Sequence, residues 1–284
     1  MNGQAKRKTM NMRRSPHIIV LATILATATS PRVSPGQTAL LQNDLKAISD
    51  ATTPLRALRI GTTNIYHLKE SKSVYFFEAK MQINADGAPK AYNKDTSLGL
   101  DNLANAGSAG NWWGIVTDTG NADGKPILQE KGDPAPGFYV SGTTLQDSTK
   151  LDEDQKRYVN SEAIPFYVLP KNIQIPMKIG DFGFVVNRSN NAGSGCIFAD
   201  VGPEDSIGEG SIALAKAIGI PSDPKSEGSE ETYAYVIFSN TSLGWPLDPK
   251  FITEHAKALF AQWGGLPRLQ QAMPKTLTRA DKRH

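Results

Sequence analysis

The sequence has very few residues that could bind a transition metal or form a disulfide. Its 284 residues include one cysteine, Cys196, so an intramolecular disulfide is excluded. The histidines are scattered, without an HExxH or similar spacing, at His17, His67, His255 and His284. We therefore expect neither a metal site nor a cofactor. A lone cysteine on a strand is most often a small apolar core residue, and we expect this of Cys196.

The middle of the chain also lacks an excess of positive charge. The whole chain has a net charge of +3, but residues 73–265 hold 15 basic and 24 acidic side chains, a net charge of −9. Nucleic-acid binding needs a cationic surface, so this composition argues against that class of function. An acidic domain would attract a polycation, and it would equally serve solubility alone.

Long apolar runs are absent except near the N-terminus. There, five basic residues between Lys6 and Arg14 precede the run IIVLATILATA (Ile18–Ala28), which ends in small residues. This pattern predicts a signal peptide over residues 1–28, and hence a secreted or periplasmic protein with no membrane association after cleavage. The run is too short and too rich in Ala and Thr for a good membrane span, although an uncleaved anchor is the alternative. The pair Arg13-Arg14 hints at a twin-arginine signal.

The remaining chain divides by composition into three parts. Residues 29–70 read as a linker and variable segment, with a short helix over Thr38–Ile48, and residues 267–284 as a frayed basic tail. Residues 71–266 hold the predicted domain. Two helices are expected in it: one over 211–218 capped by Ser211, and one over Phe251–Trp263 that stops at the following glycines.

Strand signals dominate the predicted domain. Val74–Asn84 alternates, with Tyr75, Phe77, Ala79, Met81 and Ile83 on one face. Further β-rich runs, separated by Gly, Pro, Asn and Asp, are WWGIVTD (112–118), GFYVS (137–141), IPFYVLP (164–170), FGFVV (182–186), CIFADV (196–201) and YAYVIF (233–238). Many short strands without alternating helices predict a mainly β barrel or sandwich.

One acidic segment, FADVGPEDSIGEGS (198–211), contains four carboxylates. Taken singly, Asp200 reads as a turn-initiating residue at a strand end, and Glu209 as part of a solvated loop. The glycines that flank Glu209 could let the backbone approach a bulky ligand closely. As a pair on the two banks of a cleft, Asp200 and Glu209 could supply the acid and base of glycosidic cleavage. Glu204 and Asp205, which lie between them, are expected at the loop surface.

Several ordered segments together resemble the chitosanases of glycoside hydrolase family 75. The resemblance covers residues 70–265 and rests on FEAKMQINADGAPKAY (77–92), SLGLDNLANAGSAGNWWGIVTD (97–118), DPAPGFYVSGTTLQD (133–147), YVNSEAIPFYVLP (158–170) and FADVGPEDSIGEGSIALA (198–215). It implies a core similar to a six-stranded double-psi β-barrel with a few short helices. It also implies endo-acting, inverting hydrolysis of β-1,4-linked glucosamine polymers, with Asp200 and Glu209 as the essential acids.

The roles within the pair and the substrate contacts are further expectations. Glu209 is favoured as the general acid, because Glu has the higher reference pKa and a cleft would raise it; Asp200 is then the base. Related barrel enzymes tend to use the strand-end Asp as the acid, which leaves the reverse assignment open. Expected substrate-binding residues, from their places in the matched segments, are Lys80, Asp86, Trp113 and Asp118.

Two other functions use the same features. The carboxylates could cut another amino-sugar polymer such as peptidoglycan, or the barrel could bind a polysaccharide without cleaving it. The presence of both carboxylates argues against a non-catalytic binder. The expected partner is a polysaccharide, chitosan, and the expected assembly state is a monomer.

Overall fold

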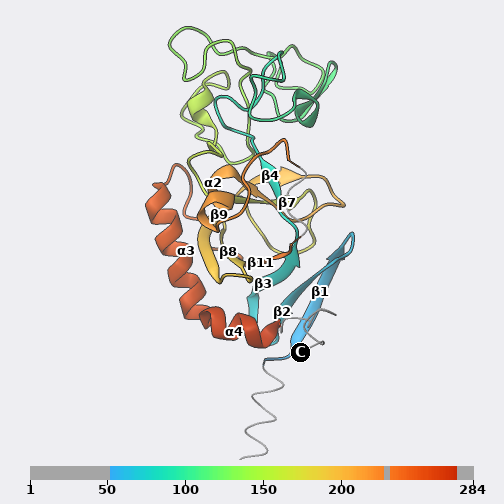
Figure 1. The fold of residues 1–284 in the computed structure, drawn as a ribbon, viewed down its shortest axis with the longest axis vertical. Coiled ribbons are helices and arrows are strands. Elements are labelled where there is room, and N and C mark those ends of the chain that lie inside the picture. Colours follow the sequence, from blue (N-terminus) through green and yellow to red (C-terminus); the bar gives the residue numbers. More distant parts are fainter. Residues whose placement is uncertain (1–51, 227–230, 274–284) are drawn as a thin grey trace, which may run out of the picture. The chain divides into compact units, whose positions relative to one another are not determined.

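The computed structural model describes residues 52–226 and 231–273. The expected signal peptide and the expected helix over Thr38–Ile48 lie outside these residues. The described chain is mainly β: a large mixed sheet, a small two-stranded sheet and a few helices (Figure 1). Within residues 52–226 and 231–273, none of the helices has the length and apolar character to cross a membrane.

The large sheet has nine strands. In chain order they are β1 (Pro54–Ile60), β2 (Thr63–Leu68), β3 (Ser71–Ala79), β4 (Gln82–Asn84), β7 (Phe166–Pro170), β8 (Phe182–Asn187), β9 (Ala192–Gly202), β10 (Glu209–Ser211) and β11 (Tyr233–Phe238). The small sheet pairs β5 (Gly107–Ser108) with β6 (Asn111–Trp112). The helices are α2 (Ile212–Ala217), α3 (Pro249–Trp263) and α4 (Gly265–Ala272), and η1 (Leu103–Ala106) and η2 (Gln155–Arg157) are 3₁₀ turns.

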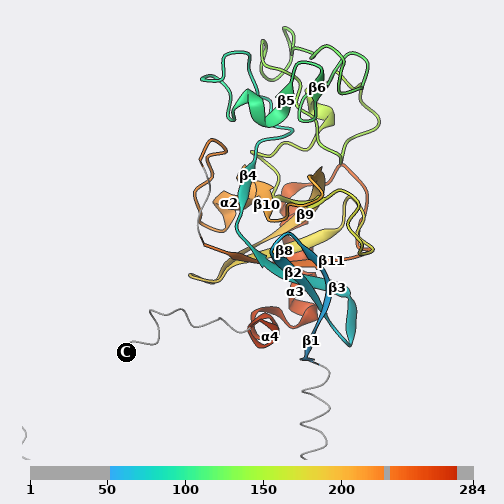
Figure 2. The ribbon, with the colours of Figure 1, turned by 90° about the vertical axis from the view of Figure 1, so that its right-hand side faces the viewer.

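The large sheet must curl back on itself. Its strands lie in the order β1-β2-β3-β11-β8-β9-β7-β10-β4. Only Lys80 and Met81 separate β3 from β4 in the chain, yet these strands take the third and the last place in the sheet. Figure 2 shows the chain running directly from β3 into β4. Most neighbouring strands are antiparallel, whereas β7–β9 and β10–β4 are parallel.

Each face of the curled sheet carries its own hydrophobic core. One core contains Phe77, Tyr167, Phe198 and Tyr235 together with side chains of α2. The other lies between the sheet and helices α3 and α4, and includes Phe76, Phe184, Val236, Phe260 and Trp263. All six residues of β8 and of β11 are therefore buried, and these strands read as continuous apolar runs. Cys196 is buried in the first core, as expected.

The sequence predicted most of the regular elements. The runs at 164–170, 182–186, 196–201 and 233–238 correspond to β7, β8, β9 and β11, and both predicted helices are present as α2 and α3. The run Val74–Asn84 is broken at Lys80 and Met81. Val74 and Phe76, on the face opposite Tyr75 and Phe77, are also core residues. The prediction of regular strands at 112–118 and 137–141 is wrong. These runs form isolated bridges within an irregular segment between β4 and β7.

Both ends of the predicted domain need correction. The expected linker over residues 29–70 contains the β1–β2 hairpin, and β2 pairs with β3 as part of the large sheet. The expected frayed tail over 267–284 contains most of α4, whose Leu269 and Ala272 are buried against the second core. The domain is therefore larger at both ends than composition alone indicated.

The junction between β10 and α2 is anchored by one serine. The Ser211 hydroxyl caps α2 by accepting from the Leu214 N–H at 3.0 Å, as expected. It also accepts from the N–H of Phe166 at 3.0 Å and donates to the carbonyl of Ile164 at 2.8 Å. Because Ser211 is fully buried two residues after Glu209, it ties β10 to the start of β7.

Replacing Ser211 with alanine should therefore destabilise this junction. The change leaves two buried N–H groups and one carbonyl without their partner, so we expect the free energy of unfolding to fall by about 2 kcal/mol. Urea denaturation measures the difference. Ser206→Ala, on an exposed turn, is the matched control and should change stability by less than about 0.5 kcal/mol. A loss for Ser211→Ala no larger than this would contradict the anchoring role.

Candidate active site

Two acidic residues lie on either side of strand β7. Asp200 of β9 is the register partner of Val168, and Glu209 of β10 is the register partner of the same Val168 from the other side. Neighbouring strands lie about 4.8 Å apart, so about 10 Å separates the α-carbons of Asp200 and Glu209. All three side chains line one cavity. The fold thus brings together the two carboxylates that the sequence paired.

The glycines that flank Glu209 have a steric reason to be there. Gly208 has φ +104°, and a β-carbon on it would collide with the carbonyl oxygen of Lys80. A β-carbon on Gly210 would lie 2.9 Å from Cδ2 of Leu214. The expectation that these glycines make room for a ligand is therefore corrected. They let β10 approach the β3–β4 junction and α2, and this close packing fixes the position of Glu209.

The cavity has a volume of about 1130 Å³. Strands β4, β7, β9 and β10 contribute to one part of its lining, and the irregular segment between β4 and β7 contributes to the other. Five further polar side chains contribute to the lining besides the acidic pair: Asn84, Asp86, Tyr92, Asp101 and Thr144. The volume and the polar lining suit a ligand that is larger than a single small metabolite and rich in hydroxyl or amino groups.

Asp200 is surrounded by hydrogen-bond donors. Its Oδ1 accepts from the N–H of Thr144 at 2.9 Å, from the hydroxyl of Thr144 at 2.7 Å and from the N–H of Val201 at 2.9 Å. Burial raises the pKa of Asp200, and these three donors work in the opposite direction because they favour the charged form. The second oxygen, Oδ2, is left for another partner in the cavity.

Glu209 accepts fewer hydrogen bonds than Asp200. Burial raises the pKa of Glu209 to about 7, and the nearby charge of Asp200 adds to the rise. One donor opposes it, the amide Nδ2 of Asn84, which lies 2.7 Å from Oε1. A carboxyl group with a pKa near neutrality can hold a proton and release it to a substrate, which is the property of a general acid.

A third carboxylate, Asp86, lies beside this pair. Burial and the charge of Asp200 raise the pKa of Asp86 well above its ordinary value. Tyr92 donates its hydroxyl to Oδ1 of Asp86 at 2.7 Å, and Asn84 contacts Oδ2 at 3.4 Å. Burial and the charge of Asp86 also raise the pKa of Tyr92, so its phenol is a firm donor. Asp86 therefore belongs to the hydrogen-bonded group around Glu209.

Trp113 is the most exposed aromatic side chain in the cavity lining, with 65% of its surface accessible. Its indole Nε1 donates to the carbonyl of Asn105 at 2.8 Å, which fixes the direction of the ring. Trp112 also lines the cavity but packs in part against the first core. Trp113 therefore offers a flat ring surface in the cavity, whereas Trp112 takes part in the core.

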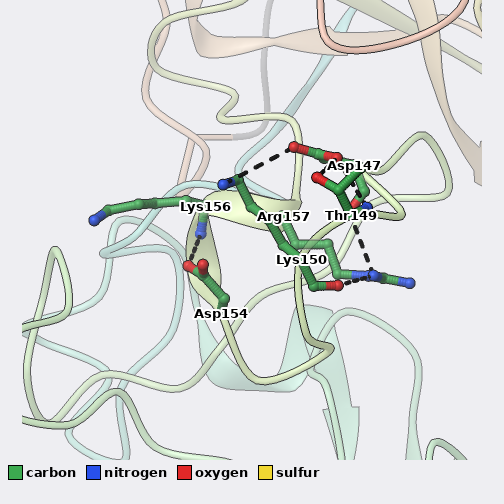
Figure 3. Close-up of polar contacts among 6 residues, drawn as sticks. All are labelled: Asp147, Thr149, Lys150, Asp154, Lys156 and Arg157. Atoms are coloured by element: carbon green, nitrogen blue, oxygen red, sulfur yellow. Dashed lines mark hydrogen bonds and ion pairs between the residues drawn. The ribbon is translucent and has the colours of Figure 1, made fainter.

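A loop of residues 146–158 forms one wall of the cavity and is held by Arg157 (Figure 3). The Arg157 guanidinium donates to the carbonyl oxygens of Asp147, at 3.3 Å, and of Lys150. It also pairs with the carboxylate of Asp152 at 3.0 Å. Arg157 and Asp152 both contribute to the cavity lining. The contacts of Arg157 thus hold this wall together in addition to the short turn η2.

The expected binding residues divide into two groups. Asp86 and Trp113 line the cavity, whereas Lys80 and Asp118 do not. Asp118 instead accepts a hydrogen bond from the N–H of Lys125 at 2.8 Å within an exposed turn. The expectation that Lys80 and Asp118 line the cleft is therefore wrong. Glu204 and Asp205 are exposed outside the cavity, as the sequence indicated.

Three residues of this site were not singled out from the sequence. Asn84, Tyr92 and Thr144 make the hydrogen bonds that hold Asp86, Asp200 and Glu209. All three lie within the segments that carry the family resemblance, at 77–92 and 133–147. Asn84 is the last residue of β4, whereas Tyr92 and Thr144 lie in the irregular segment and had no periodic signal.

No group of three or more His, Cys, Asp or Glu side chains that could hold a metal ion occurs among residues 52–226 and 231–273. Comparison with models of known protein families and with curated proteins gave no match for this chain.

The raised pKa of Glu209 has a consequence for stability. Between about pH 4.5 and pH 7 the folded protein holds a proton on Glu209 that the unfolded chain has lost, so this residue makes stability fall as the pH rises. Glu209→Gln removes that contribution. We expect the variant to gain stability relative to the wild type on going from pH 4.5 to pH 8, by about 1–3 kcal/mol.

Urea denaturation at the two pH values measures this difference. Glu204→Gln, which makes the same change on the exposed turn, should show no such gain. If the stability difference between Glu209→Gln and the wild type is the same at pH 4.5 and pH 8, Glu209 does not have a raised pKa.

Proposed function

We propose that the protein is a secreted, endo-acting glycoside hydrolase that cleaves β-1,4 linkages in chitosan with inversion. The proposal rests first on Asp200 and Glu209, which face one cavity from either side of β7 and differ in their surroundings. Glycosidic cleavage needs two such carboxyl groups, one protonated and one ionised. The resemblance of residues 70–265 to family 75 chitosanases supplies the substrate class.

In this proposal Glu209 is the general acid and Asp200 the general base. Glu209 has one donor and a pKa of about 7, so it carries a proton in mildly acidic solution. Asp200 accepts three hydrogen bonds on one oxygen, which favour its ionised form. Glu209 would protonate the leaving glycosidic oxygen, while Asp200 would take a proton from the attacking water.

The separation of the two acids supports inversion. Inverting enzymes keep their carboxyl groups about 6.5–9.5 Å apart so that a water molecule fits beside the sugar ring, whereas retaining enzymes keep them about 5 Å apart. The α-carbons of Asp200 and Glu209 are two strand spacings apart, about 10 Å, which is compatible with a carboxyl separation in the inverting range. The attack then comes from the face opposite the leaving group, and the configuration at the anomeric carbon inverts.

Charge and cavity shape support a cationic sugar polymer. The central part of the sequence has a net charge of −9, and Asp101 lines the cavity near the proposed catalytic pair. Protonated glucosamine units are attracted to such a field. Trp113 offers a flat ring against which a sugar can stack. Asp86 and Trp113 are therefore the proposed binding residues among the four that the sequence indicated.

The curled sheet supports the double-psi β-barrel that the resemblance implies. In this proposal β3 and β4 act as one interrupted strand, and the ring is completed by β11, β8, β9, β7 and β10. These are six strands when β3 and β4 are counted together. The site then lies at one end of the ring, where β9 ends and β10 begins.

Neutralising either proposed catalytic residue should abolish turnover without unfolding the protein. Removal of an essential acid or base costs at least about 10³ in kcat, so we expect this loss for both Glu209→Gln and Asp200→Asn. Release of reducing ends from chitosan measures the rate, and circular dichroism checks the fold. Glu204→Gln and Asp205→Asn make the same changes on the exposed turn and should retain wild-type turnover.

The same assay separates the alternatives when chitosan, chitin and bacterial cell-wall polymer are compared side by side. Preferential cleavage of cell-wall polymer would favour a peptidoglycan hydrolase that uses the same carboxylates. Binding of chitosan without any new reducing ends would favour a non-catalytic polysaccharide-binding protein. Near-normal turnover in either Glu209→Gln or Asp200→Asn would overturn the assignment of the catalytic pair.

A further inference from the structure

The structure points to Asn84 as the residue that selects which oxygen of Glu209 carries the catalytic proton. We infer that Asn84 holds Oε1 as a permanent hydrogen-bond acceptor and leaves Oε2 as the proton-carrying oxygen. Asn84 is a positioning residue in this inference, because it acts through Glu209. The inference rests on the proposed function for its consequence in catalysis, but the hydrogen-bond arrangement can be tested without any substrate.

The orientation of the Asn84 amide is fixed by three contacts. Its Oδ1 accepts from the backbone N–H of Asp86 at 2.6 Å. Its Nδ2 lies 2.7 Å from Oε1 of Glu209 and 3.4 Å from Oδ2 of Asp86. If the amide were reversed, an oxygen would face two carboxyl groups and an NH₂ group would face an N–H. Asn84 must therefore donate to Glu209.

The other oxygen of Glu209 points in a different direction. A β-carbon placed on Gly202 would lie 3.4 Å from Oε2 of Glu209. Gly202 is the last residue of β9, two residues after Asp200, and it also lines the cavity. Oε2 is therefore directed from β10 across β7 towards the strand that carries Asp200. This is the gap in which a glycosidic oxygen would have to lie between the two acids.

Further contacts, made by Asp86, Tyr92 and strand β10, keep Asn84 in place. Asp86 is held by the hydroxyl of Tyr92 at 2.7 Å, and Tyr92 is itself almost fully buried. Asn84 is also buried, and its strand β4 pairs with β10 so that Asn84 is the partner of Ser211. The donor to Glu209 is thus supported from the backbone and from the side-chain network at the same time.

The donor also opposes the other influences on Glu209. The titratable groups that face Glu209 are Asp200 on β9, Asp86 after β4, Asp101 and Tyr92 in the irregular segment, and Tyr235 on β11. Burial is the largest cause of the raised pKa of Glu209, and the negative charges of Asp200 and Asp101 raise it further. A hydrogen bond from Asn84 favours the ionised form and keeps the pKa close to neutrality.

Two substitutions at Asn84 test this inference. Asn84→Ala removes the donor, and Asn84→Asp removes it while keeping an acceptor for the N–H of Asp86, so the second variant guards against a failure to fold. The Glu209 carboxyl carbon is titrated by carbon-13 NMR without substrate and assigned by its disappearance in Glu209→Gln. We expect the pKa of Glu209 to rise by roughly one unit in Asn84→Ala and by more in Asn84→Asp, because the new carboxyl group also disfavours the ionised form of Glu209.

Activity on chitosan gives a second readout. The alkaline limb of the kcat/KM profile should move to higher pH by the same amount, and kcat should fall roughly tenfold because Oε2 is no longer held in direction. Asn172→Asp is the matched control: its amide donates to Oε1 of Glu204 at 2.7 Å on the exposed surface, outside the cavity. It should change neither the titration nor the profile.

The outcomes separate the inference from the proposed function. An unchanged titration of Glu209 in both Asn84 variants would overturn the role of Asn84, whatever the enzyme cleaves. A raised pKa in a protein that cleaves no chitosan would support the hydrogen-bond arrangement and count against the proposed substrate alone. A fall in kcat without any movement of the alkaline limb would reduce Asn84 to a structural residue and would overturn the inference.

Discussion

The pairing of β7 with β9 on one side and β10 on the other is the constraint on which the site depends. It makes Val168 the common partner of Asp200 and Glu209, so the distance between their α-carbons is set by backbone hydrogen bonds. The Ser211 hydroxyl and the close approach of Gly208 to Lys80 hold β10 in that place. Asp200 and Glu209 therefore lie on rigid strands, which keep their backbone positions at a fixed distance from each other.

Burial raises the pKa of both carboxyl groups, but the two groups accept different numbers of hydrogen bonds. Three donors converge on one oxygen of Asp200, while Glu209 receives one donor from Asn84. Environments that push two neighbouring acids apart in pKa assign their roles in acid–base chemistry. The loops between β4 and β7 supply Thr144 and Tyr92 to this network, so the irregular segment takes part in setting the chemistry as well as the cavity wall.

Part of this arrangement could be predicted from the sequence and part could not. Alternation placed Asp200 at a strand end, and the spacing of the acidic segment together with the family resemblance singled out Glu209. The sequence does not predict that Asp200 and Glu209 both pair with Val168, because register between strands distant in sequence is decided by packing. Asn84 lies 125 residues from Glu209, and contacts at that range leave no periodic pattern. The β1–β2 hairpin was missed because its exposed polar residues resemble those of a linker.

The configuration of the first product tests the central claim most directly. When a chitosan oligosaccharide is hydrolysed inside an NMR tube, the anomeric proton of the new reducing end reports the configuration before mutarotation. The proposed acid–base pair on either side of β7 predicts that the α-anomer appears first from a β-1,4 linkage. Initial release of the β-anomer would show retention, and it would contradict an acid–base pair set this far apart.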